Sequence, residues 1–230
     1  MKSPGQRLFV ALALAAILVG VAIVISQGSD DDAGSSDEPT EIADRFAGIE
    51  QDGMTLGDPS AELTVIEFAD PQCPFCAEFA ADGLPGVIDE YVRPGRIRLD
   101  FAVLTFIGPD SEAMARLIAA ASLQDHAWET IDLLYARQGT ENSGYATEEF
   151  LAEAAADVPG LDAEQALADR DSPEVDAILE AARKSAARSG INSTPTFVAV
   201  GESGEAQALE LGSLDAAAFS EAVDPLLSGG

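Results

Sequence analysis

The chain has few cysteines, histidines and basic side chains. Its 230 residues include two cysteines, one histidine and 12 basic side chains, and among these only Lys2 and Lys184 are lysines. Phosphate contacts are made by Lys and Arg, so this scarcity, with 41 acidic residues and a formal net charge of −29, disfavours binding to nucleic acid or anionic lipid surfaces. The acidity fits adaptation to high salt, where charges are screened beyond roughly 3 Å at 1 M. It equally fits a solvated surface that keeps the protein soluble.

Both cysteines lie in one short motif, DPQCPFC, at residues 70–76. Two cysteines this close cannot join distant parts of the chain, so ordinary disulfide stabilisation is not an obvious purpose. A zinc site usually has four ligands, and only His126 and carboxylates are left to complete one. Covalent haem requires a histidine directly after the second cysteine, and Ala77 occupies that position. A redox-active pair is therefore favoured, and an inert structural disulfide is the alternative.

A long apolar segment, LFVALALAAILVGVAIVI, occupies residues 8–25. As a helix it would be about 27 Å long, close to the hydrocarbon thickness of a bilayer. Lys2 and Arg7 precede it, so the positive-inside rule predicts a cytoplasmic N-terminus at residues 1–7 and export of everything after Ser26. A cleaved signal peptide is the alternative. We favour a retained anchor because the run is long and no Ala-x-Ala site stands at its end.

An acidic linker and a short helix are predicted for residues 26–53. Residues 26–40 are small, polar and acidic, a composition typical of a disordered tether. Ile42 and Phe46 follow at helical spacing, which predicts a short amphipathic helix at the start of the folded part. Glycines and a proline predict a loop at residues 53–59.

The cysteine motif lies between two predicted strands. Residues 63–69, LTVIEFA, have the β-branched and apolar character of a buried strand, and residues 96–104 alternate well enough to form a second strand. The segment between them is helical in pattern, with an interruption expected at Gly83 and Pro85 and a continuation over residues 87–92. Strand, helix and strand in this order predict a βαβ unit with the cysteines at its first junction.

Helical patterns rich in alanine then fill residues 109–189, with no strand candidate among them, which predicts an all-helical insertion. Three residues are predicted to cap its helices: Asp110, Thr147 and Ser172. Strands return at residues 194–200 and 205–211 as a hairpin, and a final helix is predicted over 214–227. The folded domain is therefore expected to span residues 54–228.

The motif has the chemistry of a thiol that exchanges disulfides. A thiolate, not a thiol, attacks a disulfide, and the N-terminus of a helix favours the charged form. Cys73 is expected at that position, exposed at the mouth of the helix. Pro74 suits the first turn, where its missing N–H costs no hydrogen bond. Cys76, one turn deeper on the same face, could then reach Cys73 and resolve a mixed disulfide.

The stretch LTVIEFADPQCPFC, residues 63–76, closely resembles the start of the DsbA-like thioredoxin-fold proteins, which are exported thiol–disulfide oxidoreductases. The likeness extends in order over residues 54–228, and C-x-x-C alone would be a weak signal. Three features carry it together: the Cys73-Pro74-Phe75-Cys76 motif, Thr194-Pro195 at the position of the family's cis-proline, and Glu67 at the position of its buried acid. The resemblance implies an α/β thioredoxin-like fold with an all-helical insertion, behind the N-terminal transmembrane helix.

The resemblance also implies roles for the three catalytic candidates. Cys73 would form the mixed disulfide with a substrate and Cys76 would resolve it, so that the pair cycles through a Cys73–Cys76 disulfide. Burial of Glu67 would raise its pKa and let it exchange a proton with Cys76. A solvated carboxylate at the strand end is the alternative for Glu67.

Substrate is expected to bind beside Phe75, Thr194 and Pro195. An X–Pro bond adopts the cis form at a cost of only about 0.5–1 kcal/mol, and Pro195 would leave the backbone near Thr194 free to pair with an extended substrate. An ordinary proline at a strand start is the alternative. Because Phe75 carries no charge to stabilise a thiolate, we expect a less oxidising couple than in relatives with a basic residue at this position.

The function that these features predict is a membrane-tethered, extracytoplasmic thiol–disulfide oxidoreductase acting on exported proteins that contain cysteines. No cofactor or metal is expected, since the electrons reside in the two thiols. The resemblance implies a membrane partner that resets the pair, either DsbB-like or vitamin K epoxide reductase-like, and favours disulfide formation. Reductase and isomerase activities are alternatives on the same scaffold. A non-catalytic, membrane-anchored binding module, with a buried or inert Cys73, is the alternative from a different class.

Overall fold

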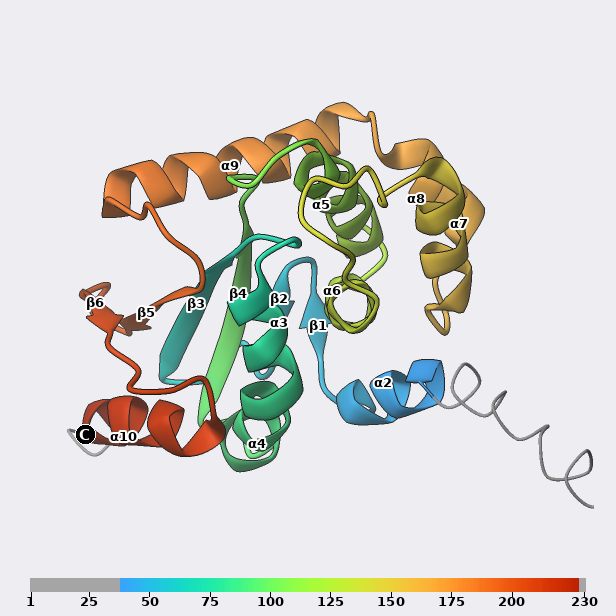
Figure 1. The fold of residues 1–230 in the computed structure, drawn as a ribbon. Coiled ribbons are helices and arrows are strands. Elements are labelled where there is room, and N and C mark those ends of the chain that lie inside the picture. The colour runs from blue at the N-terminus through green and yellow to red at the C-terminus, as the bar shows by residue number, and fades with distance from the viewer. Residues whose placement is uncertain (1–37, 228–230) are drawn as a thin grey trace, which may run out of the picture. The chain divides into compact units, whose positions relative to one another are not determined.

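The computed structural model describes residues 38–227, and these residues are built around a six-stranded sheet (Figure 1). Its strands are β1 (Gln51–Asp52), β2 (Thr55–Leu56), β3 (Leu63–Ala69), β4 (Ile97–Val103), β5 (Thr196–Gly201) and β6 (Ala206–Leu209). They lie in the order β1-β2-β4-β3-β5-β6. β3 and β4 are parallel, and the other neighbouring pairs are antiparallel.

The predicted anchor at residues 8–25 lies outside the described residues, as do the N-terminal residues before it and the linker up to residue 37. Among the helices of residues 38–227, none combines the length and apolar character needed to cross a membrane.

The predicted βαβ unit is confirmed by the central strands. β3 covers the expected residues 63–69, and β4 pairs with it in parallel register from Leu63 opposite Ile97 to Ala69 opposite Val103. The near-continuous apolar sequence of β3 follows from the burial of both of its faces. Because side chains alternate along a strand, Glu67 lies on the same face as Ala69.

Helices cover both faces of the sheet (Figure 1). The α-helices are α2 (Glu38–Phe46), α3 (Pro74–Glu78), α4 (Leu84–Val87), α5 (Pro109–Ser122), α6 (Ala127–Ala136), α7 (Glu148–Asp157), α8 (Ala163–Asp169), α9 (Pro173–Ser189) and α10 (Ala216–Leu227), and the π-helical segments are η1 (Phe79–Gly83) and η2 (Ile88–Val92). On one face, Ala186 of α9 is buried with Phe68 of β3. On the other, the rings of Phe79, Phe197 and Phe219 join η1, β5 and α10.

Five helices, α5 to α9, occupy the segment between β4 and β5, where the sequence predicts an all-helical insertion. The predicted caps Thr147 and Ser172 are confirmed, because the hydroxyl of each accepts a backbone N–H from the first turn of its helix. The third predicted cap, Asp110, is wrong. Gly108 takes that position, since Pro109 begins the helix, and the Asp110 carboxylate accepts the N–H of Gly144 instead.

The predicted loop at residues 53–59 is in part a hairpin. β1 and β2 pair with each other, and β2 continues the sheet by pairing with β4. Gly53 lies in the turn between them with φ of 59°. Strands of two residues are too short to show a periodic pattern in the sequence. The preceding helix, α2, agrees with the prediction and buries Ile42 and Phe46 in the core.

The interruption predicted at Gly83 and Pro85 does not occur. The helix continues from Pro74 to Val92 by inserting two π-helical segments. The N–H of Leu84 donates to the carbonyl of Phe79, five residues back, and this widened turn precedes Pro85. Pro85 then lies in the first turn of α4, where the absence of its N–H is tolerated.

Candidate active site

Cys73 lies at the N-terminal end of the active-site helix, as predicted. It is the N-cap residue of α3, with φ of −73° and ψ of 118°, and Pro74 follows in the first turn. Both cysteines are present as free thiols. The backbone N–H groups of Phe75 and Cys76 form hydrogen bonds with the side chain of Cys73. The sulfur of Cys73 therefore contacts N–H groups at the N-terminal end of the helix, which favour a negative charge.

Thr194 and Pro195 lie against Cys73 from the other side. The Thr194–Pro195 peptide bond is cis, the geometry that the family resemblance implied. Antiparallel pairing of β5 with β3, with Thr196 opposite Phe68, brings these residues to the carboxyl end of β3. The Cys73 thiol donates to the main-chain carbonyl of Thr194 over 3.3 Å.

The expected exposure of Cys73 is wrong. The residue is only 4% exposed. Its sulfur lies beneath the carbonyl of Thr194, a residue 121 positions away in the chain. Burial of this kind does not make the thiol inert, because the groups around the sulfur decide its ionisation.

The pKa of Cys73 is lowered to about 6, chiefly by a hydrogen bond from the side chain of Cys76. The side chain of Thr194 and the N–H groups of the helix end lower it further, and burial opposes them. A thiol with this pKa is largely ionised at neutral pH. Cys73 therefore has the electrostatic character of a nucleophile.

The pKa of Cys76 is shifted in the opposite direction. Cys76 is fully buried, and burial, followed by the hydrogen bond to Cys73 and the charge of Glu67, raises its pKa far above the ordinary value. Cys76 therefore keeps its proton while Cys73 loses it. Because their pKa values are shifted in opposite directions, Cys73 can act as a nucleophile at neutral pH whereas Cys76 stays a protonated thiol.

Glu67 lies beneath the cysteine pair on β3. Only 4% of it is exposed, so the alternative of a solvated strand-end carboxylate is wrong. Burial, with a smaller contribution from the charge of Cys73, raises the pKa of Glu67 to about 8. The carboxyl group is thus mostly protonated at neutral pH and can give or take a proton within the physiological range.

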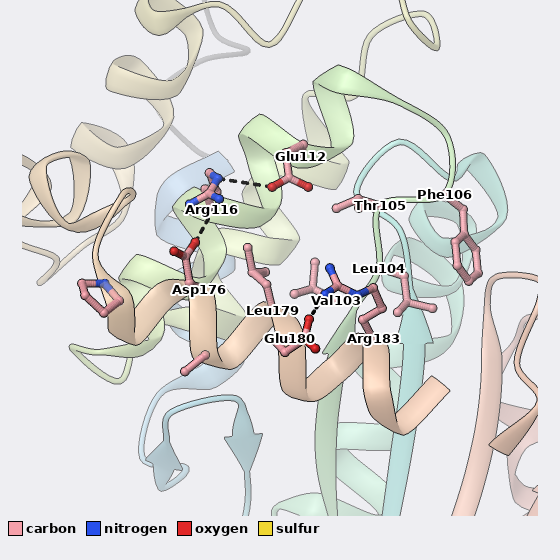
Figure 2. Close-up of a pocket in the computed structure, with 12 residues that line it drawn as sticks. Val103, Leu104, Thr105, Phe106, Glu112, Arg116, Asp176, Leu179, Glu180 and Arg183 are labelled. Carbon is pink, nitrogen blue, oxygen red and sulfur yellow. Dashed lines mark hydrogen bonds and ion pairs between the residues drawn. The ribbon is translucent and has the colours of Figure 1, made fainter. Parts of the chain in front are cut away.

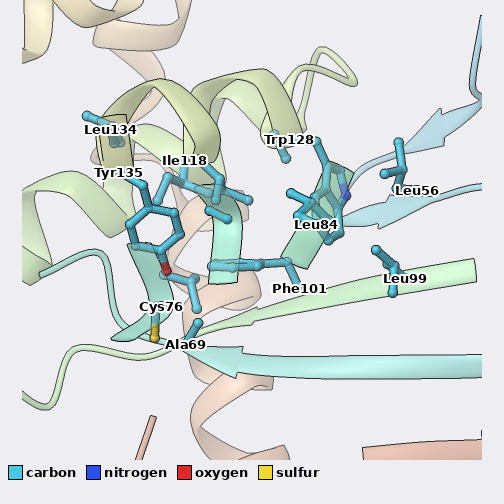
Figure 3. Close-up of a cluster of buried hydrophobic side chains, with 14 of the residues drawn as sticks. Leu56, Ala69, Cys76, Leu84, Leu99, Phe101, Ile118, Trp128, Leu134 and Tyr135 are labelled. Carbon is cyan, nitrogen blue, oxygen red and sulfur yellow. The ribbon is translucent and has the colours of Figure 1, made fainter. Parts of the chain in front are cut away.

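Two polar residues that contact the active-site loop, buried Tyr135 and half-buried Gln138, were not predicted from the sequence as part of the site. Tyr135 of α6 directs its hydroxyl toward Cys76 in the buried cluster of Figure 3, and this hydroxyl donates to the carbonyl of Asp70 over 3.3 Å. Burial, more than the neighbouring charges, raises the pKa of Tyr135 well above its ordinary value. Gln138 donates to the carbonyl oxygens of Pro71 and Cys73. The helical insertion therefore holds the active-site loop directly.

A groove of about 540 Å³ opens beside the cis-proline. Phe75, Pro195 and Phe197 line it together with the segment that joins α9 to β5. Phe75 is 59% exposed, although it is a large apolar side chain. The three residues predicted to contact substrate, Phe75, Thr194 and Pro195, are thus gathered around Cys73 and this groove.

A second groove, of about 490 Å³, lies between α5, α9 and the end of β4 (Figure 2). Apolar side chains such as Leu104 and Leu179 line it alongside charged residues. Arg116 is paired there with Glu112 and Asp176. Within residues 38–227, no group of three or more His, Cys, Asp or Glu side chains is arranged to hold a metal ion.

The arrangement suits thiol–disulfide exchange. The ionised sulfur of Cys73 is the nucleophile, and Cys76, one turn away, is the leaving thiol. Glu67, a buried acid that titrates near neutral pH, carries the proton.

Comparisons with known proteins agree with this chemistry. A family model described as thioredoxin matches residues 50–223. The probable disulfide bond formation protein D of Bacillus anthracis is 30% identical over 162 residues, which cover 69% of this chain and 74% of that relative. The crystal structure of a thioredoxin-like oxidoreductase from Silicibacter pomeroyi DSS-3 has a TM-score of 0.62 and 27% identity, covering 85% of this chain and 99% of that one.

The crystal structure of oxidised BdbD from Bacillus subtilis has a TM-score of 0.66 at 21% identity and covers 77% of this chain and 94% of that one. This likeness shows a shared fold. Sequence relationship, fold and site geometry agree: the chain belongs to the thioredoxin family and is a DsbA-like thiol–disulfide oxidoreductase.

Proposed function

We propose that the protein forms disulfide bonds in exported proteins, with Cys73 as the exchanging thiol and Cys76 as its partner. The observation that carries this proposal is the lowered pKa of Cys73 beside the raised pKa of Cys76. A sulfur that is stable as a thiolate is a good leaving group, so a Cys73–Cys76 disulfide would be readily reduced by a substrate. The names of the Bacillus relatives, disulfide bond formation protein D, support this direction.

The oxidising reaction has two steps. A substrate thiolate attacks the sulfur of Cys73 in the Cys73–Cys76 disulfide, forming a mixed disulfide and releasing Cys76. Cys76 leaves with an electron pair and takes a proton, for which Glu67 is the nearby donor. A second substrate thiolate then attacks the substrate sulfur of the mixed disulfide and releases the Cys73 thiolate. The substrate loses two electrons and the cysteine pair gains them.

The same residues run the reaction in reverse when the enzyme is reduced. The Cys73 thiolate attacks a substrate disulfide and releases one substrate thiol, and Cys76 then attacks the sulfur of Cys73 to release the other. Glu67 takes the proton of Cys76 in this direction. The uncharged Phe75 favours this second candidate, a reductase or isomerase, because it adds no cation to stabilise the thiolate.

The substrate is proposed to bind along the groove beside Pro195. The exposed ring of Phe75 offers apolar contact at its edge. Pro195 has no N–H, and the carbonyl of Thr194 lies against the sulfur of Cys73. An extended segment of an unfolded protein that pairs with this backbone would bring its cysteine to Cys73.

The proposed location is the outer face of the cell membrane, with a single-pass anchor at residues 8–25. The apolar run and the basic residues before it support this topology. Oxidation of many substrates requires that the cysteine pair be reoxidised, and a DsbB-like or vitamin K epoxide reductase-like membrane protein is proposed for that step.

The full-length chain tests the proposal when it carries Cys76→Ser. This variant cannot resolve the mixed disulfide, so it should trap cysteine-containing partners through Cys73, whereas Cys73→Ser should trap none. The wild-type protein should oxidise a reduced, unfolded substrate faster than it reduces insulin. Failure of Cys76→Ser to trap any partner would contradict the proposed roles, and faster insulin reduction would favour the reductase.

A further inference from the structure

A buried carboxylate organises the loop that leads into Cys73. Asp70 is completely inaccessible to solvent, and both of its oxygens accept hydrogen bonds. Oδ1 accepts the N–H of Gln72 at 2.9 Å and the hydroxyl of Ser111 at 2.6 Å. Oδ2 accepts the N–H of Ile107 at 3.0 Å. One side chain thus joins the active-site loop, the loop after β4 and the first turn of α5.

The bonds of Asp70 also fold the turn that ends at Cys73. Its side chain binds the N–H two residues on, and its carbonyl accepts the N–H of Cys73, three residues on, at 2.9 Å. This combination of side-chain and main-chain bonds closes a tight turn. The hydroxyl of Tyr135 donates to the same carbonyl. The turn therefore determines where the sulfur of Cys73 lies relative to the end of α3.

Every neighbour that bonds to the Asp70 side chain donates to it. The Ser111 hydroxyl donates to Asp70 and accepts from the side-chain amide of Gln72 at 2.8 Å. The side-chain oxygen of Gln72 accepts the N–H of Asn142 at 2.7 Å. An ionised carboxylate only accepts hydrogen bonds, so it fits a site where every neighbour donates.

We propose that Asp70 is a positioning residue that holds the sulfur of Cys73 against the N–H groups at the start of α3 and thereby sets the reactivity of that thiol. The inference rests on the proposed role of Cys73 as the exchanging thiol. An asparagine has the same shape, but its amide nitrogen would face one of the three donors. The turn would then loosen, and the Cys73 sulfur would move away from the N–H groups that stabilise its charge.

The test measures the pKa of the Cys73 thiol from the ultraviolet absorbance of the thiolate, in the reduced full-length protein. The other titratable groups that face Cys73 are Glu67, Cys76 and Tyr135, and they are unchanged in the variants. In Asp70→Asn the loss of the negative charge alone would lower the thiol pKa. We expect the displacement of the sulfur from the helix N–H groups to outweigh this effect, so the thiol pKa should rise by about one unit, toward the ordinary value of about 8.5. Ser111→Ala removes one hydrogen-bond donor and keeps the Asp70 carboxylate, so it should raise the thiol pKa by less. This second variant also tests the inference if Asp70→Asn does not fold.

Asp132→Asn is the matched control. Asp132 is another buried carboxylate, 4% exposed, and is paired with Arg45 on α2. Its loss should lower the melting temperature and leave the thiol pKa unchanged. The inference is overturned if folded Asp70→Asn and Ser111→Ala keep the wild-type thiol pKa, or if Asp132→Asn raises that pKa as much as they do. An ordinary, unreactive thiol in the wild-type protein would overturn the proposed function as well.

Discussion

The sulfur of Cys73 lies 3.3 Å from the main-chain carbonyl oxygen of Thr194, the residue joined to Pro195 by a cis bond. The thiol form of Cys73 donates a hydrogen bond to this carbonyl. The side chain of Thr194, in contrast, lowers the pKa of Cys73 by stabilising its thiolate form. Thr194 therefore contacts the sulfur in both of its protonation states. A substitution can remove its hydroxyl and leave its main-chain carbonyl in place, so the two contacts can be tested separately.

Thr194→Val should make the protein a weaker oxidant. The substitution keeps the shape of the side chain and removes the hydroxyl, so the pKa of Cys73 should rise from about 6 by a few tenths of a unit. A less stable thiolate lowers the reduction potential, here by roughly 10 mV. Equilibration with glutathione measures the potential. Thr194→Ser keeps the hydroxyl and should match the wild type, and equal potentials for Val and Ser would contradict the role of the hydroxyl.

Phe75→His should make the protein a stronger oxidant. Phe75 is 59% exposed, so its replacement leaves no cavity. A protonated imidazole near the thiolate would lower the pKa of Cys73, and each unit of pKa corresponds to about 30 mV in a two-electron couple. The potential should therefore rise by tens of millivolts at a pH where the histidine is charged. Phe75→Leu, which is apolar and uncharged, is the control, and an equal change in both variants would contradict an effect of charge.

Local sequence signals sufficed for much of the fold. The strands β3 and β4, the capping residues Thr147 and Ser172, and the final hairpin of β5 and β6 all agree with the sequence. In each case a periodic pattern or a capping residue lies within the element itself. The interruption predicted at Pro85 was wrong because a π-helical turn, which has no recognised sequence signal, accommodates the proline.

The environment of the site could be predicted only in part. The position of Cys73 at a helix start follows from the motif, but its burial depends on Thr194, 121 residues later. The Asp70 network was missed because two of its three donors come from positions 37 and 41 residues away, Ile107 and Ser111. A single sequence carries no signal for such pairs before the topology is known.

Gly83→Ala should destabilise the protein by about 1–3 kcal/mol, the usual cost of overpacking. A Cβ atom at Gly83 would lie 2.6 Å from the main-chain oxygen of Leu214 and 2.6 Å from the ring of Phe79. Main-chain atoms cannot rotate away, so the segment before α10 would have to move. Urea-induced unfolding measures the loss. Gly212→Ala is the control, because a Cβ there meets no atom within 4 Å, and an equal loss at both positions would contradict the steric explanation.

Glu67→Gln should be increasingly more stable than the wild type as pH rises. Burial raises the pKa of Glu67 from 4.5 to about 8, so between these values the folded wild type keeps a proton that the unfolded chain releases. The folded state then binds more protons, and wild-type stability falls as pH rises through this window.

Glutamine does not titrate, so the difference in unfolding free energy between Glu67→Gln and the wild type should be constant below pH 4.5. It should grow by up to about 1.4 kcal/mol per pH unit between pH 4.5 and about 8, and be constant again above that range. Urea-induced unfolding at a series of pH values measures this difference. Both proteins are compared in the disulfide form, so that ionisation of Cys73 does not contribute. Burial, the principal cause of the raised pKa, persists in that form, and a difference that stays constant from pH 4.5 to 8 would show that Glu67 titrates as an ordinary carboxylate.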